Sequence, residues 1–186
     1  MAGTSAAATS GATGRERLTH TASVPSFEDT LSALNELKAD GVISQYAIAG
    51  AMALVFWIEP VPTYDLDVLV FLPEPTGAIV SLDRIYEWAR KRNYRIDKEH
   101  IVIGGIPVQF LPAHNEIADE AIETAVAMAY GNVEVRVVRP EYLIALYLEP
   151  SAKTLKRRER TAALLDSGKV DSAVLQTLMS RFKLTF

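Results

Sequence analysis

A chain of 186 residues is long enough to bury a hydrophobic core and is the length of one domain. With 49% hydrophobic residues, 23% charged residues and a formal net charge of −4, its composition is that of a soluble globular protein. The sequence contains no cysteine, which excludes a disulfide framework, a thiolate zinc site and a cysteine nucleophile.

Residues 1–25 are rich in Ala, Thr, Ser and Gly, so we predict a disordered leader there. This segment lacks the apolar core of a secretory signal. The longest apolar run, 47–58, is too short to span a bilayer. We therefore expect a cytoplasmic protein that does not associate with membranes.

The remaining sequence predicts an α+β (α/β mixed) fold, in which a mixed sheet is backed by helices. We expect a single domain over 26–186, with a sheet core at about 26–138 and a helical C-terminal part at about 139–186. The predicted helices are 26–39 with Ser26 as N-cap, a short helix after Gly50, one after Ser81, one near 116–125, one that starts at Pro140, and two more at about 152–167 and 170–183. The predicted strands are 45–49, 64–72, the hairpin pair 100–103 and 106–111, and 133–138.

Asp65 and Asp67 are two residues apart at the start of an apolar run that predicts a central, buried strand. Residues i and i+2 of a strand share a face, so the two carboxylates point the same way. Two like charges placed there repel each other and lose hydration, at a cost of several kcal/mol per ion. A divalent cation relieves both effects, and we predict a Mg²⁺ (or Mn²⁺) site. The alternative is an ordinary pair of strand-end carboxylates without a metal.

Gly50 and Ala51 form a tight turn between the predicted strand 45–49 and a short apolar helix. Free backbone N–H groups at such a turn can bind phosphate. The turn would then place a phosphate beside the Thr63-x-Asp65-x-Asp67 strand. Alternatively, Gly50 only permits close packing of helix against strand.

These motifs together resemble the nucleotidyltransferases of the DNA polymerase beta-like superfamily. Their signature is a hydrophobic residue, Gly and a small residue, then Asp-x-Asp or Asp-x-Glu after an interval, and here it is Ala49-Gly50-Ala51 followed by Asp65-Leu66-Asp67. The chain looks most like the small bacterial branch related to AbiEii-type toxin nucleotidyltransferases, which often carries a Thr where Thr63 stands. The resemblance extends weakly through 105–112 and 137–146 to the end of the chain.

Three positions depart from the family pattern. Gln109 stands where a third carboxylate usually completes the metal site, and an amide is neither charged nor a base. Ala51 replaces the more usual Ser or Gly, and Val61 replaces a frequent Arg. Glu116 or Glu120, in the predicted acidic helix, is an alternative source of the third ligand.

The C-terminal part is basic. From Pro150 onward there are eight Lys and Arg residues and three carboxylates, a net charge of +5. Since the whole chain carries −4, the first 149 residues carry −9. A basic helix beside an acidic sheet favours an anionic substrate between them. Lys156, Arg158 and Arg160 are therefore candidates to bind a triphosphate or an RNA backbone, and the family resemblance favours Lys156. The alternative is a solvated helix face.

Three histidines, His20, His100 and His114, are not spaced as metal ligands, and we expect structural or exposed roles for them.

The resemblance implies a metal-dependent nucleotidyltransferase that moves an NMP from a nucleoside triphosphate to a hydroxyl acceptor and releases pyrophosphate. Asp65, Asp67 and Gln109 would be the catalytic residues, and Gly50, Ala51, Thr63, Lys156 and Arg158 would bind the nucleotide. A tRNA end or other RNA, a protein hydroxyl, or a small molecule such as an aminoglycoside is a possible acceptor. Two alternatives remain open: a catalytically weak or inactive nucleotide- or RNA-binding module, and a toxin–antitoxin-type protein that binds a partner protein.

Overall fold

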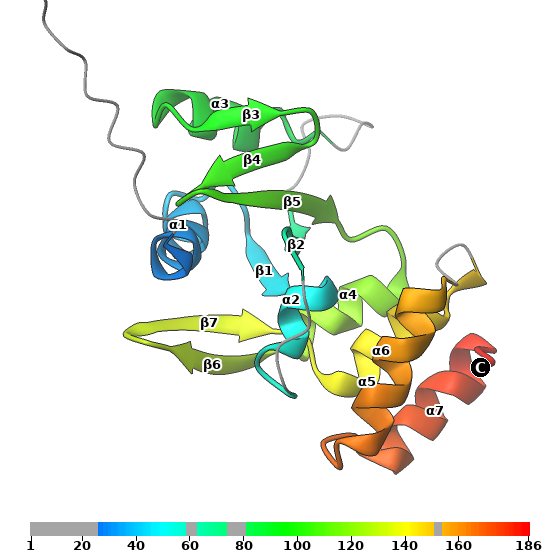
Figure 1. The fold of residues 1–186 in the computed structure, drawn as a ribbon. Helices are drawn as coiled ribbons and strands as arrows, with labels where there is room; N and C mark the ends of the chain where they lie inside the picture. Colours follow the sequence, from blue (N-terminus) through cyan, green and yellow to red (C-terminus); the bar gives the residue numbers. More distant parts are fainter. Residues whose placement is uncertain (1–25, 59–62, 74–80, 151–153) are drawn as a thin grey trace, which may run out of the picture.

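The computed structural model describes residues 26–58, 63–73, 81–150 and 154–186. Within them, helices pack around one seven-stranded sheet (Figure 1). The predicted leader lies outside the described residues, as does Val61. The strands are β1 (Gln45–Ile48), β2 (Leu66–Phe71), β3 (Arg95–Asp97), β4 (His100–Ile103), β5 (Ile106–Pro112), β6 (Val126–Tyr130) and β7 (Val133–Val137). The helices are α1 (Phe27–Ala39), α2 (Gly50–Leu54), α3 (Asp83–Lys91), α4 (Glu116–Glu123), α5 (Pro140–Leu148), α6 (Leu155–Asp166) and α7 (Ser172–Phe182).

The sheet has the strand order β3-β4-β5-β2-β1-β7-β6, so β2 is its central strand. β2 runs antiparallel to β1 and parallel to β5, which makes the sheet mixed. Leu66, Val68 and Val70 of β2 are almost completely buried. The predicted α+β architecture and the central position of the strand that carries the Asp-x-Asp motif are confirmed.

Local sequence explains how α1 begins and how it is held. The Ser26 hydroxyl accepts a hydrogen bond of 3.1 Å from the Asp29 N–H, which caps the helix as predicted. Leu31, Leu34 and Leu37 recur at helical spacing and are fully buried against the sheet. Thr30, also buried, donates a 2.8 Å hydrogen bond to the Ile103 carbonyl oxygen and so ties α1 to the β4–β5 hairpin.

The two edge strands, β3 and β6, were not predicted from sequence. β3 is only three residues long and two of them, Arg95 and Asp97, are charged and exposed. β6 contains two alanines, which have a low preference for strands. Both form because a neighbouring strand supplies the pairing partner: β4 for β3 and β7 for β6.

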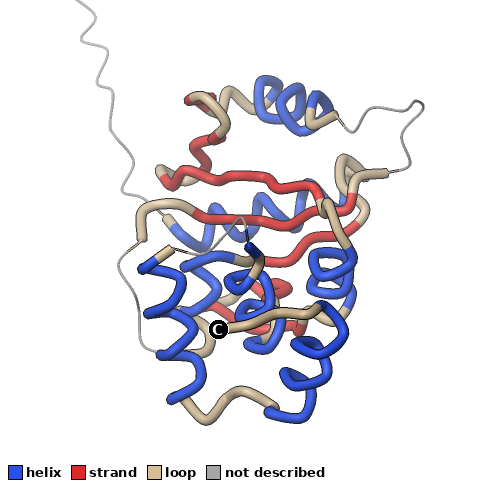
Figure 2. Tube along the Cα trace, turned by 90° about the vertical axis from the view of Figure 1, so that its right-hand side faces the viewer, coloured by secondary structure: helices blue, strands red, loops and turns tan. Residues whose placement is uncertain are grey.

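The C-terminal helices form a group of their own, in the lower half of Figure 2. α5 is buried along nearly its whole length and packs against α4, α6 and α7. Glu141, buried in α5, accepts a 2.7 Å hydrogen bond from the Asp171 N–H at the start of α7 and pairs with Arg139 at 3.3 Å. These contacts hold α7 against α5.

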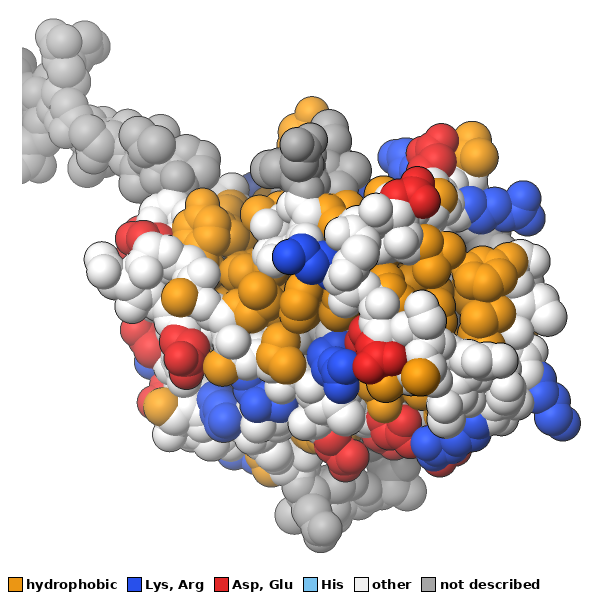
Figure 3. Space-filling view, turned by 90° about the horizontal axis from the view of Figure 1, so that it is seen from below, with side chains coloured by type: hydrophobic (Ala, Val, Ile, Leu, Met, Phe, Trp, Pro, Cys, Tyr) orange, Lys and Arg blue, Asp and Glu red, His pale blue; other side chains and the backbone are white. Residues whose placement is uncertain are grey.

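Aromatic side chains from α1, from β6 and from the segment after α2 pack together. The ring of Tyr130 lies 4.7 Å from that of Phe27 and 6.2 Å from that of Phe56, in edge-to-face arrangements. The Trp57 indole N–H donates a 2.9 Å hydrogen bond to the Val138 carbonyl oxygen. When the molecule is seen from below, hydrophobic side chains gather over the middle of the face, with charged ones scattered around them (Figure 3). No helix among the described residues is both long and apolar enough to cross a bilayer.

Candidate active site

Asp67 lies on the central strand and Asp65 directly before it, so the two side chains share one face, as the sequence predicts. Both line a cavity of about 590 Å³, together with Thr63, which precedes them. The Thr63 hydroxyl donates a 2.9 Å hydrogen bond to Oδ1 of Asp65 and so orients that carboxylate. The structure thus brings together three of the residues proposed from sequence.

The electrostatics of Asp67 favour a bound cation. Burial raises the pKa of its carboxyl group, and the charge of Asp65 raises that pKa further. Arg157, Arg160 and His100 oppose the shift without cancelling it. A divalent cation between the carboxylates would remove both the repulsion and the loss of hydration. No group of three or more His, Asp or Glu side chains within the described ranges is arranged to hold a metal ion. Mg²⁺ is, however, usually bound by one or two carboxylates, with substrate phosphates and water completing its coordination.

Gly50 lies directly against this site, where any larger residue would clash with Asp67. Its φ is +60°, and a Cβ atom built on it would stand 1.9 Å from Oδ2 of Asp67. The Ala49 N–H donates a 2.9 Å hydrogen bond to the Asp67 carbonyl oxygen, which fixes the turn to β2. Ala51 lines the same cavity as the two carboxylates. Glycine is required here both for its backbone conformation and for the space it leaves.

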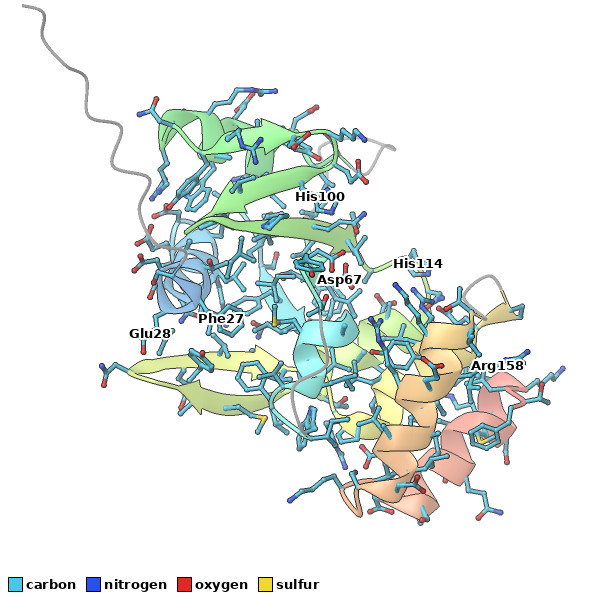
Figure 4. All side chains as sticks on the ribbon, in the orientation of Figure 1. Phe27, Glu28, Asp67, His100, His114 and Arg158 are labelled. Carbon is cyan, nitrogen blue, oxygen red and sulfur yellow. The ribbon has the colours of Figure 1, made fainter. Side chains whose placement is uncertain are left out.

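Helix α6 presents two of its cations to the cavity. Lys156 and Arg160, one turn apart, line it together with the carboxylates. Nε of Arg160 is buried and has no hydrogen-bond partner among the described residues, so it is free to donate to a ligand. Arg158 is exposed and is not a lining residue, and Figure 4 shows it on the side of α6 away from Asp67. Of the predicted basic ligands, the structure therefore brings Lys156 and Arg160 to the site and leaves Arg158 outside.

Gln109 lies on β5 directly opposite Asp67 in the parallel register, where the family pattern would place a third carboxylate. The two alternatives in α4 do not replace that carboxylate. Glu116 and Glu120 both pair with Arg181 of α7, and neither lines the cavity. Their expected role as a missing metal ligand is not supported by this arrangement.

Two residues that sequence reasoning missed contact the site from the C-terminal helices. Tyr147 of α5 is buried beside Gly50, and the guanidinium of Arg157 lies 5.8 Å from the centre of its ring. Both line a second, smaller cavity of about 180 Å³ that also reaches Asp67. The walls of this cavity are mainly apolar, with Leu69, Leu111, Leu143 and Leu146 among them. Its residues come from separate elements, so no local pattern in the sequence could indicate it.

Comparison with solved structures places this arrangement among known folds. One similar structure is an antigenic nucleotidyltransferase-like protein from Paracoccidioides brasiliensis, with 14% identity, a TM-score of 0.53, and coverage of 84% of this chain and 88% of that one. Another is ANT(2'')-Ia in complex with adenylyl-2''-tobramycin, with 16% identity, a TM-score of 0.51, and coverage of 83% of this chain and 97% of the other.

This chain has a nucleotidyltransferase fold. The predicted resemblance is thereby confirmed at the level of the fold, whereas the AbiEii-type branch stays a prediction. No protein-family model matches the sequence, and no curated protein matches it. Within this nucleotidyltransferase fold, the Asp65-Leu66-Asp67 motif opens the central strand and the Gly50 turn lies beside it.

Proposed function

We propose that the protein is a metal-dependent nucleotidyltransferase, which transfers an NMP from a nucleoside triphosphate to a hydroxyl acceptor and releases pyrophosphate. One observation carries the proposal: two same-face carboxylates, Asp65 and Asp67, line a cavity that Lys156 and Arg160 also line. Acidic and basic groups around one cavity suit a metal-bound polyphosphate. The nucleotidyltransferase fold supports this assignment.

Each part of the cavity has its own task. Asp65 and Asp67 would hold Mg²⁺ or Mn²⁺, which when bound neutralises phosphate charge and orients the reacting groups. Lys156 and Arg160 would bind the triphosphate oxygens, and Nε of Arg160 supplies a donor that lacks a partner among the described residues. Gly50 lets the Asp67 carboxylate pack directly against the turn, and Ala51 lines the cavity beside it. Phosphoryl transfer depends mostly on such positioning and charge neutralisation.

A binding titration tests the proposal. ATP, GTP, CTP and UTP are titrated with and without Mg²⁺ or Mn²⁺, on the wild type and on the Asp65→Asn/Asp67→Asn double variant. We expect metal-dependent binding of at least one nucleotide by the wild type and its loss in a double variant that remains folded. Equal binding by both proteins would refute the assigned site, and no binding by the wild type would refute the function.

A second candidate is a nucleotide- or RNA-binding module without turnover, which Gln109 favours because it supplies no third carboxylate at its position beside Asp67. Metal-dependent binding without pyrophosphate release, with RNA, protein and small-molecule hydroxyls as acceptors, would select it. The two candidates share the binding site and differ in whether transfer of the NMP follows nucleotide binding.

A further inference from the structure

Three side chains stand in a row across three adjacent strands of the sheet. Asp67 on β2 pairs with Gln109 on β5, and Gln109 pairs with His100 on β4. Directly paired residues project from the same face of a sheet. Since neighbouring strands are about 4.8 Å apart, the α-carbons of His100 and Asp67 are separated by roughly 10 Å. A ligand atom between the two side chains is within reach of both.

His100, and not Gln109, is among the side chains that line the 590 Å³ cavity with Asp65 and Asp67. When protonated, His100 also lowers the pKa of Asp67 in part, so the two side chains lie close enough for their charges to interact. In Figure 4, His100 and Asp67 come from neighbouring parts of the sheet, whereas His114 lies beyond the end of β5. The sequence suggested only a structural or exposed role for His100, because the β2–β5–β4 register was not visible in it.

Glu99 lies beside the imidazole on the side of Nδ1. Its Oε1 is 3.8 Å from Nδ1 of His100, and the His100 side chain is about three-quarters buried, with 24% exposed. A carboxylate next to Nδ1 favours the tautomer that carries its proton there, which leaves Nε2 as the proton acceptor. A base oriented by a third group is the arrangement by which enzymes activate hydroxyl nucleophiles.

Other acidic side chains near the site are occupied. Asp97, the register partner of His100 on β3, is paired with Arg95 at 3.4 Å. Glu116 and Glu120 are paired with Arg181. The charged groups that line the cavity with His100 are Asp65, Asp67, Arg95, Asp97, Lys98, Glu99, Lys156 and Arg160.

We propose that His100 is the proton acceptor of the transfer reaction, and that Glu99 is its positioning residue. The inference rests on the proposed function. As the acceptor hydroxyl attacks, its O–H bond breaks and the proton moves to Nε2, while its oxygen forms a bond to the α-phosphorus. The bond between that phosphorus and the oxygen bridging to the β-phosphate breaks, and pyrophosphate leaves with the electron pair. The imidazolium then returns its proton to solvent.

The test compares turnover and binding in matched variants. Pyrophosphate release is measured with Mg²⁺, the nucleotide that binds in the titration above, and glycerol, RNA or aminoglycoside as hydroxyl probes. We expect His100→Gln to lower kcat by roughly 10²- to 10⁴-fold, the usual contribution of general base catalysis. Its Kd for the nucleotide should change by less than about twofold, because the imidazole contacts the acceptor and not the phosphates. The acidic limb of the pH–rate profile should disappear, because the base that it reports is gone.

Three further variants extend the test, and the first of them keeps it decisive if His100→Gln is poorly folded. Glu99→Gln should lower kcat less than His100→Gln and should leave nucleotide binding intact. Gln109→Asp placed in the His100→Gln background should restore part of the lost kcat, because it returns a carboxylate to the row. His114→Gln, which removes a histidine that lines only the smaller 180 Å³ cavity, should keep the acidic limb.

Unchanged kcat and an unchanged acidic limb in His100→Gln would overturn the inference. Metal-dependent binding by a wild type that never releases pyrophosphate would overturn it as well, and would leave the binding module. A wild type that binds no nucleotide would instead refute the proposed function itself, so the two failures are distinguishable.

Discussion

The hydroxyl group of Tyr147 donates a 2.7 Å hydrogen bond to the carbonyl oxygen of Gly50, 97 residues earlier in the chain. This bond joins α5 to the turn that lies against Asp67. Burial raises the pKa of Tyr147 to about 12, so the hydroxyl keeps its proton, and remains a donor, across the working pH range. This buried side chain therefore attaches the helical C-terminal part to the site. Cations of α6 line the cavity of the same site.

Replacement of Tyr147 by Phe keeps the aromatic ring, and it should still weaken nucleotide binding. The change removes one hydrogen bond to the Gly50 carbonyl oxygen, at a net cost of about 0.5–1.5 kcal/mol. If about 1 kcal/mol of this appears at the turn, the Kd for Mg²⁺–nucleotide rises roughly fivefold. Tyr142→Phe is the matched control, because it removes another α5 hydroxyl, which donates at 3.0 Å to Glu120 away from the cavity. Equal nucleotide affinity in both variants would contradict the coupling.

Gly50→Ala should abolish metal-dependent binding and lower stability. The left-handed backbone conformation alone costs an alanine roughly 1–2 kcal/mol. The added methyl group must in addition displace the Asp67 carboxylate, because it would stand 1.9 Å from Oδ2. Gly168→Ala isolates the first effect, since Gly168 has a φ of +68° and an added methyl carbon there would meet no atom within 4 Å. Thermal unfolding and nucleotide titration of the two variants separate strain from displacement, and equal binding in both would refute the clash.

Asp67→Asn should make the metal-free protein more stable at neutral pH while removing its response to Mg²⁺. A carboxyl group whose pKa is raised in the folded state binds its proton more tightly there than in the unfolded chain. Its contribution to the free energy of unfolding therefore falls as the pH rises from its ordinary value of 3.8 through the raised one, and the penalty is complete above the raised pKa. Asparagine carries no such penalty. Urea unfolding from pH 4 to pH 8, with and without Mg²⁺, measures both effects, and a less stable metal-free variant at pH 7 would be the contrary result.

The effect of removing a cation from α6 should depend on which face of the helix carries it, and not on charge alone. Lys156→Ala and Arg160→Ala each remove a group that lines the cavity, so we expect a roughly tenfold rise in the Kd for Mg²⁺–nucleotide, the equivalent of about 1.4 kcal/mol. Arg158→Ala removes the same charge from the same helix at an exposed position and should change Kd by less than about twofold. The Arg158 effect should also fade as salt is raised, because an exposed charge is screened. Equal losses in all three variants would mean that the helix acts only through its net charge.

Local chemistry explains which features could be predicted. The Ser26 cap, the buried run after Asp67 and the glycine pair at 104–105 are each decided by a few neighbouring residues, and the structure has the corresponding helix, strand and hairpin. The shared face of Asp65 and Asp67 follows from the two-residue period of a strand. For this reason the fold and the acidic half of the site could be predicted from the sequence.

The other half of the site depends on phase and register, which sequence alone does not determine. Arg158 and Arg160 look equivalent in a basic run, and only the docking of α6 decides which of them faces the cavity. His100 and Asp67 are 33 residues apart and become near neighbours only through the pairing of β2 with β5 and of β5 with β4. Tyr147 could be recognised as a core residue but not as the partner of Gly50.

The sheet also contains a narrow seam, whose consequence concerns motion. β1 and β7 are joined in register at Ile48 and Val137 alone, with the next bond running from the Val138 N–H to the Ile48 carbonyl oxygen. β2 and β5, by contrast, pair along five positions. Few backbone hydrogen bonds therefore couple the β6–β7 hairpin to β1, and side-chain bonds such as that from Asn35 to the Glu134 carbonyl oxygen hold the hairpin instead. A nucleotide held on the β2 side would slow amide exchange up to β1, while the amides of β6 and β7 would continue to exchange at their unliganded rates.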